Sequence, residues 1–258
     1  MKVSMIALTL AGFLAGAGAA QAQTVIALMD GNVIAPIDAK TWTAGKAMKV
    51  SGVQGKLVGI DVRPADGMLY GLFDNGTVAV IDTKTGMATT KSKLDTMLKP
   101  GTHATVDFNP VADRLRVIGS DGTNLRANVD DGKVTTDGSL KYAEGDANKG
   151  KTPNVVAGSY TNSVKGAKET ALFNIDTATG ALVKQAPPND GVLNAVGPLG
   201  VKSANYAFDI VTLDASANEG WLLADGTLYR VDLAKGAASE VGKVKGVEGA
   251  VHDIAVLP

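Results

Sequence analysis

The sequence predicts an all-β chain folded as a five-bladed β-propeller. A strand-and-turn pattern recurs at intervals of 44, 46, 48 and 56 residues, and the two ends of the chain complement each other as parts of one such unit. A period of about 40–50 residues with several strands per unit is typical of propeller blades. Composition agrees, because 31 glycines and only 5% aromatic residues suit short strands and turns better than long amphipathic helices.

The first complete unit, residues 58–86, shows the pattern most clearly. Two extended apolar runs at 59–63 and 68–73 are separated by the turn sequence PADG, and Asn75-Gly76 is a strong hairpin signal before a third strand at 77–81. The turn sequence DTKTG closes the unit. A β-sandwich would alternate apolar and polar residues, whereas residues 68–73 are apolar on both faces, as a strand between two packed blades requires.

Weaker copies of this unit follow along the chain. Its third strand ends at Ile37-Asp38, Ile81-Asp82, Ala127-Asn128, Ile175-Asp176 and Val231-Asp232. An innermost strand with a central aspartate recurs at 59–62, 105–108, 207–210 and 252–255, and 155–158 is a degenerate copy that lacks the carboxylate. Two other stretches, 132–153 and 187–205, are irregular, and residues 94–101 are expected to form a single helical turn.

The two chain ends predict how the ring closes. Residues 251–257 resemble an innermost strand without a hairpin after it, and residues 24–48 resemble a hairpin without a strand before it. Together they make one composite blade, so we expect the N- and C-terminal strands to pair. A solenoid would not need complementary ends, and a sixth blade would need another copy within 132–153 or 187–205.

Residues 1–22 have the pattern of a signal peptide. Lys2 is followed by an apolar, small-residue run and by Ala20-Gln21-Ala22, a typical cleavage pattern. Glycines within the run and the lack of a basic cluster after it disfavour a membrane anchor. We therefore expect a single propeller domain over residues 23–258, periplasmic or secreted, monomeric and without a membrane span after signal removal.

Charge and cysteine content exclude several functions. Lys and Arg number 25 against 26 Asp and Glu, without a basic stripe, so nucleic acid is not an expected partner. The absence of cysteine excludes disulfides, thiolate metal sites and a lipoprotein anchor. Neither HExxH nor GxSxG is present, which leaves zinc-protease and serine-hydrolase functions without support.

The first candidate site is a set of aspartates on the innermost strands. They are Asp61, Asp107, Asp209 and Asp253, and we expect them at the same place in each strand, facing the axial channel. Like charges held close in a low dielectric need a cation, a proton or an arginine. They indicate either a cation or paired-acid hydrolytic site, or a structural role in which each carboxylate caps amides of the adjoining blade. The structural role is favoured, because buried carboxylates usually find backbone donors.

Arginines form the second candidate. The chain has five, all on predicted blade strands: Arg63, Arg114, Arg116, Arg126 and Arg230. A buried arginine needs carboxylates, carbonyls or an anionic ligand. Salt bridges to the repeated aspartates are the favoured explanation. The alternative is that Arg63, Arg114, Arg116 and Arg126 frame a pocket for an anionic or sugar-like ligand.

Two further patterns are weaker. His103 and His252 stand at the start of innermost strands, and a general base or a two-histidine metal site would require them to converge with a partner. Asp146-x-Asn148-x-Gly150 has the look of a calcium loop but lacks the bidentate Glu of an EF-hand, so an Asx-turn is favoured.

One long motif resembles a known family. It runs through DFNPVADRLRV at 107–117, NLR at 124–126, GSLKYAEGDAN at 138–148, PNVVA at 153–157 and YTN at 160–162. These stretches resemble the secreted bacterial family catalogued as domain of unknown function 4394, and segments 59–71 and 187–200 are similar to it as well. The resemblance implies a secreted, propeller-like protein without an established activity, and supplies no catalytic residues.

We therefore expect a non-catalytic binding or envelope-associated module for a small polar or anionic ligand. The expected ligand-binding residues are Asp61, Arg63, Asp107, Asn109, Arg114, Arg116, Arg126, Tyr160, Asp209 and Asp253. No cofactor is expected, and calcium is kept as the alternative. The alternatives are a hydrolase that uses the channel aspartates with His103 or His252, calcium-assisted, and a repetitive structural or adhesive protein.

Overall fold

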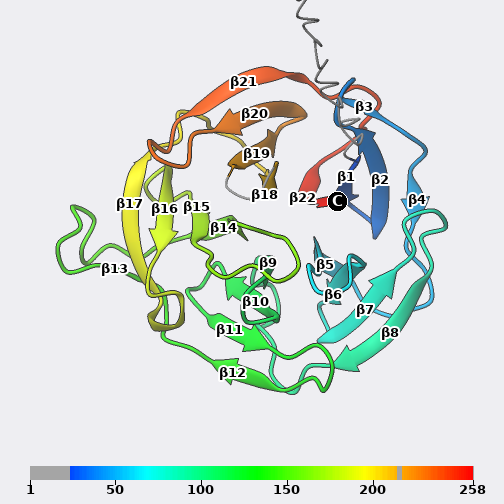
Figure 1. Ribbon diagram of the computed structural model, residues 1–258, viewed down its shortest axis with the longest axis horizontal. Coiled ribbons are helices and arrows are strands. Elements are labelled where there is room, and N and C mark those ends of the chain that lie inside the picture. Colours follow the sequence, from blue (N-terminus) through cyan, green and yellow to red (C-terminus); the bar gives the residue numbers. More distant parts are fainter. Residues whose placement is uncertain (1–23, 214–216, 258) are drawn as a thin grey trace, which may run out of the picture.

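Five antiparallel sheets stand around a central axis as the blades of a propeller in the computed structural model, which describes residues 24–213 and 217–257 (Figure 1). The predicted fold class and the predicted number of blades are confirmed. The signal-peptide prediction concerns residues outside the described ranges. Within those ranges, no helix has the length and apolar character needed to span a bilayer.

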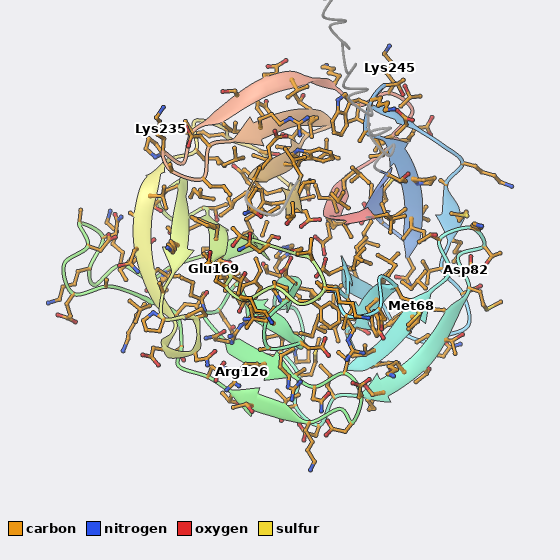
Figure 2. The ribbon with its side chains drawn as sticks, in the orientation of Figure 1. Met68, Asp82, Arg126, Glu169, Lys235 and Lys245 are labelled. Carbon is orange, nitrogen blue, oxygen red and sulfur yellow. The ribbon has the colours of Figure 1, made fainter. Side chains whose placement is uncertain are left out.

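Three blades are four-stranded sheets. From the axis outwards, blade 2 consists of β5 (Leu57–Val62), β6 (Leu69–Phe73), β7 (Thr77–Ile81) and β8 (Ala88–Lys93). Blade 3 consists of β9 (Ala104–Asn109), β10 (Arg114–Gly119), β11 (Asn124–Ala127) and β12 (Val134–Thr136). Blade 5 consists of β18 (Tyr206–Thr212), β19 (Asn218–Ala224), β20 (Thr227–Val231) and β21 (Ala238–Lys243). The DTKTG turn lies at the rim, where Asp82 Oδ1 accepts hydrogen bonds from the amides of Lys84 and Thr85 (Figure 2).

Blade 1 is built from both ends of the chain. Its inner strand, β22 (Val251–Leu257), pairs antiparallel with β1 (Thr24–Met29), so that Ile26 lies opposite Ala255 and Ala27 opposite Ile254. Outside β1 follow β2 (Val33–Asp38) and two short strands, β3 (Thr43–Ala44) and β4 (Met48–Lys49). The predicted closure of the ring by the two chain ends is confirmed.

Blade 4 takes one strand from each irregular stretch of the sequence, and the first stretch also supplies β12 of blade 3. Its strands, from the axis outwards, are β14 (Val155–Tyr160), β15 (Leu172–Asp176), β16 (Ala181–Gln185), β17 (Val192–Pro198) and the short parallel strand β13 (Lys141–Tyr142). A single 3-10 turn, η1 (Pro188–Asp190), precedes β17. Residues 132–153 and 187–205 therefore supply outer strands and their connections rather than a sixth blade.

Apolar side chains fill the spaces between neighbouring blades. Tyr70 of blade 2 packs edge-on against Phe108 of blade 3, with ring centroids 5.3 Å apart. Leu94 and Leu98 belong to the same cluster, but residues 94–101 form no helical turn, which corrects that expectation. The inner strands lie so close that a Cβ on Gly59 would approach Val106 Cγ2 to 2.4 Å.

Candidate functional site

The innermost strands are joined by side chains that reach from one blade to the next. Asp61 Oδ2 on β5 accepts a hydrogen bond from the amide of Phe108 on β9, at 2.6 Å. Asp107 Oδ1 on β9 accepts one from the amide of Tyr160 on β14, at 3.0 Å. The favoured structural role of the repeated aspartates, which is to cap amides of the adjoining blade, therefore describes both contacts.

Ser159 continues the series on β14, where the sequence pattern had lost its carboxylate. Its Oγ accepts a hydrogen bond from the amide of Ile210 on β18 at 3.1 Å and donates one to Asp209 Oδ1 at 2.9 Å. The repeat pattern did not reveal this residue, because Ser159 has a hydroxyl where the other copies have a carboxylate, directly after the degenerate copy at 155–158.

Asp209 and Asp253 complete the circle at different heights. Asp209 Oδ2 accepts from the amide of Val256 on β22, and Asp253 Oδ2 accepts from the amide of Ile60 on β5, both at 2.9 Å. On β9, β14 and β18, the amide bonded in this way belongs to the residue directly after Asp107, Ser159 or Asp209. On β22 the bonded amide is that of Val256, so the corresponding position is Ala255. The expectation that all four aspartates occupy the same place is therefore wrong for Asp253, which lies two residues earlier.

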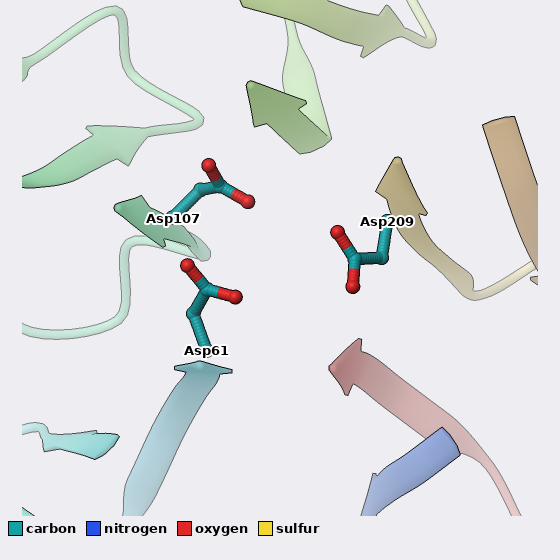
Figure 3. Close-up of side chains that lie close together, drawn as sticks. All are labelled: Asp61, Asp107 and Asp209. Carbon is teal, nitrogen blue, oxygen red and sulfur yellow. The ribbon is translucent and has the colours of Figure 1, made fainter. Parts of the chain in front are cut away.

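Three of the carboxylates converge on the axis. One oxygen each of Asp61, Asp107 and Asp209 lies within 4.8 Å of the others, and the three side chains point from β5, β9 and β18 into one central space (Figure 3). Burial raises the pKa of all three above the usual range, and repulsion by a neighbouring carboxylate adds to the effect at Asp61 and Asp107. We call these residues the axial cluster.

A cavity of about 410 Å³ opens onto this cluster at the carboxyl ends of the inner strands. Asp61 and Asp209 lie on its wall, together with Thr212 and the loops at 64–67 and 163–165. We call it the C-side cavity. It gives an otherwise buried group of acids an opening toward solvent.

Three of the five arginines, Arg63, Arg116 and Arg126, pair with aspartates other than the repeated ones, and Arg230 pairs with Glu219. Arg63 binds Asp113 through Nε and Nη2, at 2.8 and 2.6 Å, and it also binds Asp130 through Nη2, at 2.8 Å. These hydrogen bonds raise the pKa of the guanidinium. The expected salt bridges therefore form with aspartates of the turns at the strand ends and not with the axial cluster.

Blade 3 holds a second ion-pair network. Asp137 accepts hydrogen bonds from Arg116 Nη1 at 2.6 Å and from Arg126 Nε and Nη2, both at 2.9 Å. Arg116 is also bound to the hydroxyl of Tyr160, at 3.1 Å. Figure 2 places Arg126 among the outer strands of blade 3, away from the axis.

The remaining expected site residues, Asn109 and Arg114, end β9 and begin β10 on either side of a turn. Asn109 Oδ1 accepts from the amides of Val111 and Ala112, both at 2.9 Å, and Arg114 donates to the carbonyl of Asp113, at 2.8 Å. The structure thus brings together three of the ten expected ligand-binding residues on the axis. Asp253 and Tyr160 lie on the inner strands β22 and β14, and the others take part in ion pairs or in hydrogen bonds at strand ends.

The loop with a calcium-like spacing is held by its own hydrogen bonds. Asp146 Oδ1 accepts from the amide of Asn148 at 2.8 Å, Asp146 Oδ2 accepts from the amide of Ala195 at 2.7 Å, and Lys151 donates to Asn148 Oδ1. This is the Asx-turn that the sequence favoured. Among the described residues, the group of three acidic or histidine side chains close enough to hold a metal ion is the axial cluster.

Both histidines lie at the opposite, amino ends of the inner strands. His103 Nε2 is 2.8 Å from the carbonyl oxygen of Val156, and His252 Nε2 is 2.7 Å from Asp30 Oδ1. Cavities of about 290 and 410 Å³ are each lined by both histidines. The carboxylate partner of His252 is thus Asp30 and not its sequence neighbour Asp253.

Comparison with known proteins agrees with this architecture. The family model described as "Domain of unknown function (DUF4394)" matches residues 34–255. The chain belongs to this family. The description of DUF4394 names no activity, and no curated protein matches the chain.

One solved structure resembles this DUF4394 chain in fold, and a second gives a weaker match. A protein of unknown function from Bacteroides thetaiotaomicron is 15% identical with a TM-score of 0.55, and the match covers 91% of this chain and 70% of that one. A protein of unknown function from Bacteroides caccae is also 15% identical, with a TM-score of 0.45 and coverages of 88% and 75%. At this identity the likeness of the first concerns the fold alone.

Proposed function

We propose that this chain is an extracytoplasmic, non-catalytic binding module that holds a calcium ion at the axial cluster and takes a small polar or anionic ligand in the C-side cavity. The observation that carries the proposal is the convergence of three buried carboxylates within 4.8 Å beneath an open cavity. The extracytoplasmic assignment rests on the signal-peptide pattern of residues 1–22.

Electrostatics favours a cation at this place. Three buried carboxylates repel one another, and the hydrogen bonds that they accept from backbone amides compensate only part of their negative charge. The donors are oxygens alone, which suits calcium, a hard ion that takes 6–8 oxygen ligands in flexible geometry. Because Asp61 and Asp209 are each held by two backbone amides, their carboxylates are already oriented before an ion binds.

The C-side cavity would complete the coordination. Asp61 and Asp209 line it, so a bound ion would keep positions open toward the cavity for water or for an oxygen of a ligand. Ser163, Thr212 and the exposed Lys165 lie on the same wall. Hydroxyl groups and one positive charge suit a polar or anionic molecule.

Calcium binding is tested by calorimetric titration of the mature chain and by its thermal unfolding with calcium or with a chelator. We expect one site per chain and a stabilisation of about 2.7 kcal/mol at a calcium concentration one hundred times the dissociation constant. Asp107→Asn should abolish both effects, because asparagine retains an acceptor for the Tyr160 amide but removes one charge of the cluster.

Asp146→Asn is the matched control, because it removes a carboxylate from the loop with the calcium-like spacing, away from the axial cluster. It should leave calcium binding unchanged. A wild-type chain that binds no calcium, or an Asp107→Asn variant that binds it equally well, would refute the proposal.

The hydrolase alternative has less support. General acid and base groups must exchange protons with a substrate, whereas both oxygens of Asp61 and of Asp209 are already bound by amides. These contacts suit carboxylates that are held in one orientation to neutralise a bound cation rather than to transfer protons.

A further inference from the structure

The N-side mouth, where the inner strands begin, brings the two histidines of the chain together. His103 directly precedes β9 and His252 is the second residue of β22, and in the ring these two strands are separated by β5. Both histidines nevertheless line both cavities of this mouth. The two residues therefore lie at the boundary between the two cavities.

The hydrogen bonds of both rings assign the proton positions. A carbonyl oxygen can only accept, so Nε2 of His103 carries the hydrogen that it donates to Val156. Nε2 of His252 donates in the same way to the Asp30 carboxylate. With the proton on Nε2, Nδ1 of each ring is the nitrogen left to bind a metal ion, and within the described part of the chain neither Nδ1 has a hydrogen-bond partner.

This arrangement matches the surroundings of metal-binding histidines. Such a histidine almost always donates its second ring N–H to a carboxylate or a backbone carbonyl, which fixes the tautomer and raises the basicity of the ligating nitrogen. His252 has the carboxylate and His103 has the carbonyl. The protein around His103 also lowers its pKa by desolvation, with a further contribution from nearby His252, against the Val156 hydrogen bond that raises it.

We propose that His103 and His252 bind a divalent transition-metal ion through their Nδ1 atoms, with Asp30 and the Val156 carbonyl as outer hydrogen-bond partners. Imidazole nitrogens suit copper, nickel and zinc, whereas the oxygen-only axial cluster suits calcium. Two protein nitrogens leave the other coordination positions to water or to a small ligand from the cavities. The site is independent of the proposed calcium site, because it shares no residue with it.

The test uses the mature chain without a histidine tag and the metal ions alone as probes. Calorimetric titration should give one site per chain, with affinity rising from cobalt through nickel to copper and falling again for zinc. The electron paramagnetic resonance spectrum of the copper-bound chain should show coupling to two imidazole nitrogens. Spectra with coupling to none would overturn the assignment.

Variants separate the ligands from their partners. His103→Gln and His252→Gln should each remove one nitrogen coupling and weaken copper binding at least tenfold. Asp30→Asn should keep both couplings and weaken binding by about 10–100-fold. Each variant is first checked for an unchanged circular dichroism spectrum and thermal transition.

Two controls make the result specific. Lys99→Gln removes an exposed charge from the same cavity and should leave copper binding unchanged, as should Asp107→Asn in the axial cluster. Equal copper affinity in the double variant of both histidines would refute the proposal. So would inorganic phosphate binding that is lost in Lys99→Gln while no metal binds, because the mouth would then be an anion site.

Discussion

Arg116 lies between blades 3 and 4 with a side chain only 2% exposed, and its partner Asp137 is 6% exposed. A guanidinium is stable in a buried position only when its N–H groups have hydrogen-bond acceptors. Arg116 therefore also donates to Asn124 Oδ1 and Asn189 Oδ1, at 2.9 and 2.7 Å. Arg63 makes a comparable set of bonds, but its partner Asp130 is half exposed. The two networks should therefore contribute very differently to stability.

Asp137→Asn should lower the free energy of unfolding by about 3–5 kcal/mol, because it leaves a buried positive charge without its carboxylate. Asp130→Asn should cost about 1 kcal/mol or less, since water screens that pair and Asp113 still binds Arg63. Urea unfolding of both variants measures the difference. Equal losses would contradict this account.

The same carboxyl predicts a pH dependence. Although burial raises it, hydrogen bonds from Arg126 and Arg116 hold the pKa of Asp137 below its usual range. A carboxyl with a lower pKa in the folded chain stabilises the fold above about pH 4 and loses this contribution as the pH falls through the folded value. The difference in unfolding free energy between wild type and Asp137→Asn should thus shrink below about pH 4; a constant difference would exclude this origin.

At the scale of the strand, side chains of the inner strands link neighbouring blades by hydrogen bonds, as backbone hydrogen bonds link the strands within one sheet. Neighbouring blades are separate sheets, yet the amides of Phe108, Tyr160, Ile210, Val256 and Ile60 are each bound by a side chain from the preceding inner strand. Every inner strand is therefore tied to both of its neighbours.

Ser159→Ala tests the weakest chemical link of this ring. It removes the Oγ acceptor of the Ile210 amide and the donor to Asp209, in a position that is fully buried. We expect a loss of about 1–3 kcal/mol in the free energy of unfolding. Ser139→Ala, at an exposed position, should change it by about 0.5 kcal/mol or less; similar effects of both would contradict the role of Ser159.

Strand periodicity explains what could be predicted at this scale. A period of two fixes which side of a strand a residue faces, and it correctly placed Asp61, Asp107 and Asp209 together. It does not fix the height of one strand against another. The height of β22 is set by its pairing with β1 from the other end of the chain, and so Asp253 was misplaced by two residues.

At the scale of the molecule, repetition made the fold predictable, while contacts between distant residues hid much of the site. Five copies of one pattern and two complementary ends indicated the ring without any knowledge of packing. The pair of His252 and Asp30 joins residues 222 positions apart, and no local pattern signals it. The same holds for Arg63 and its partners in the turns of the next blade.

Ring closure by the two chain ends predicts the effect of a truncation. A chain that stops at residue 250 lacks β22 and with it the Val256 and Asp253 contacts to blades 5 and 2. We expect it to show no cooperative thermal transition, and a synthetic peptide of residues 251–258 to restore one. A truncated chain that unfolds as cooperatively as the full-length chain would contradict the closure.

The axial partner of β1 is β22, which is synthesised only after all the other strands of the ring. While the ribosome is still working, β1 keeps a row of unsatisfied amides and carbonyls along its axial edge, of the kind to which other chains readily add. A chain truncated before β22 would form an open row of blades in which the axial edge of β1 stays unpaired, instead of a smaller closed ring. The uncovered edge of β1 is therefore the place where association between incomplete chains would begin.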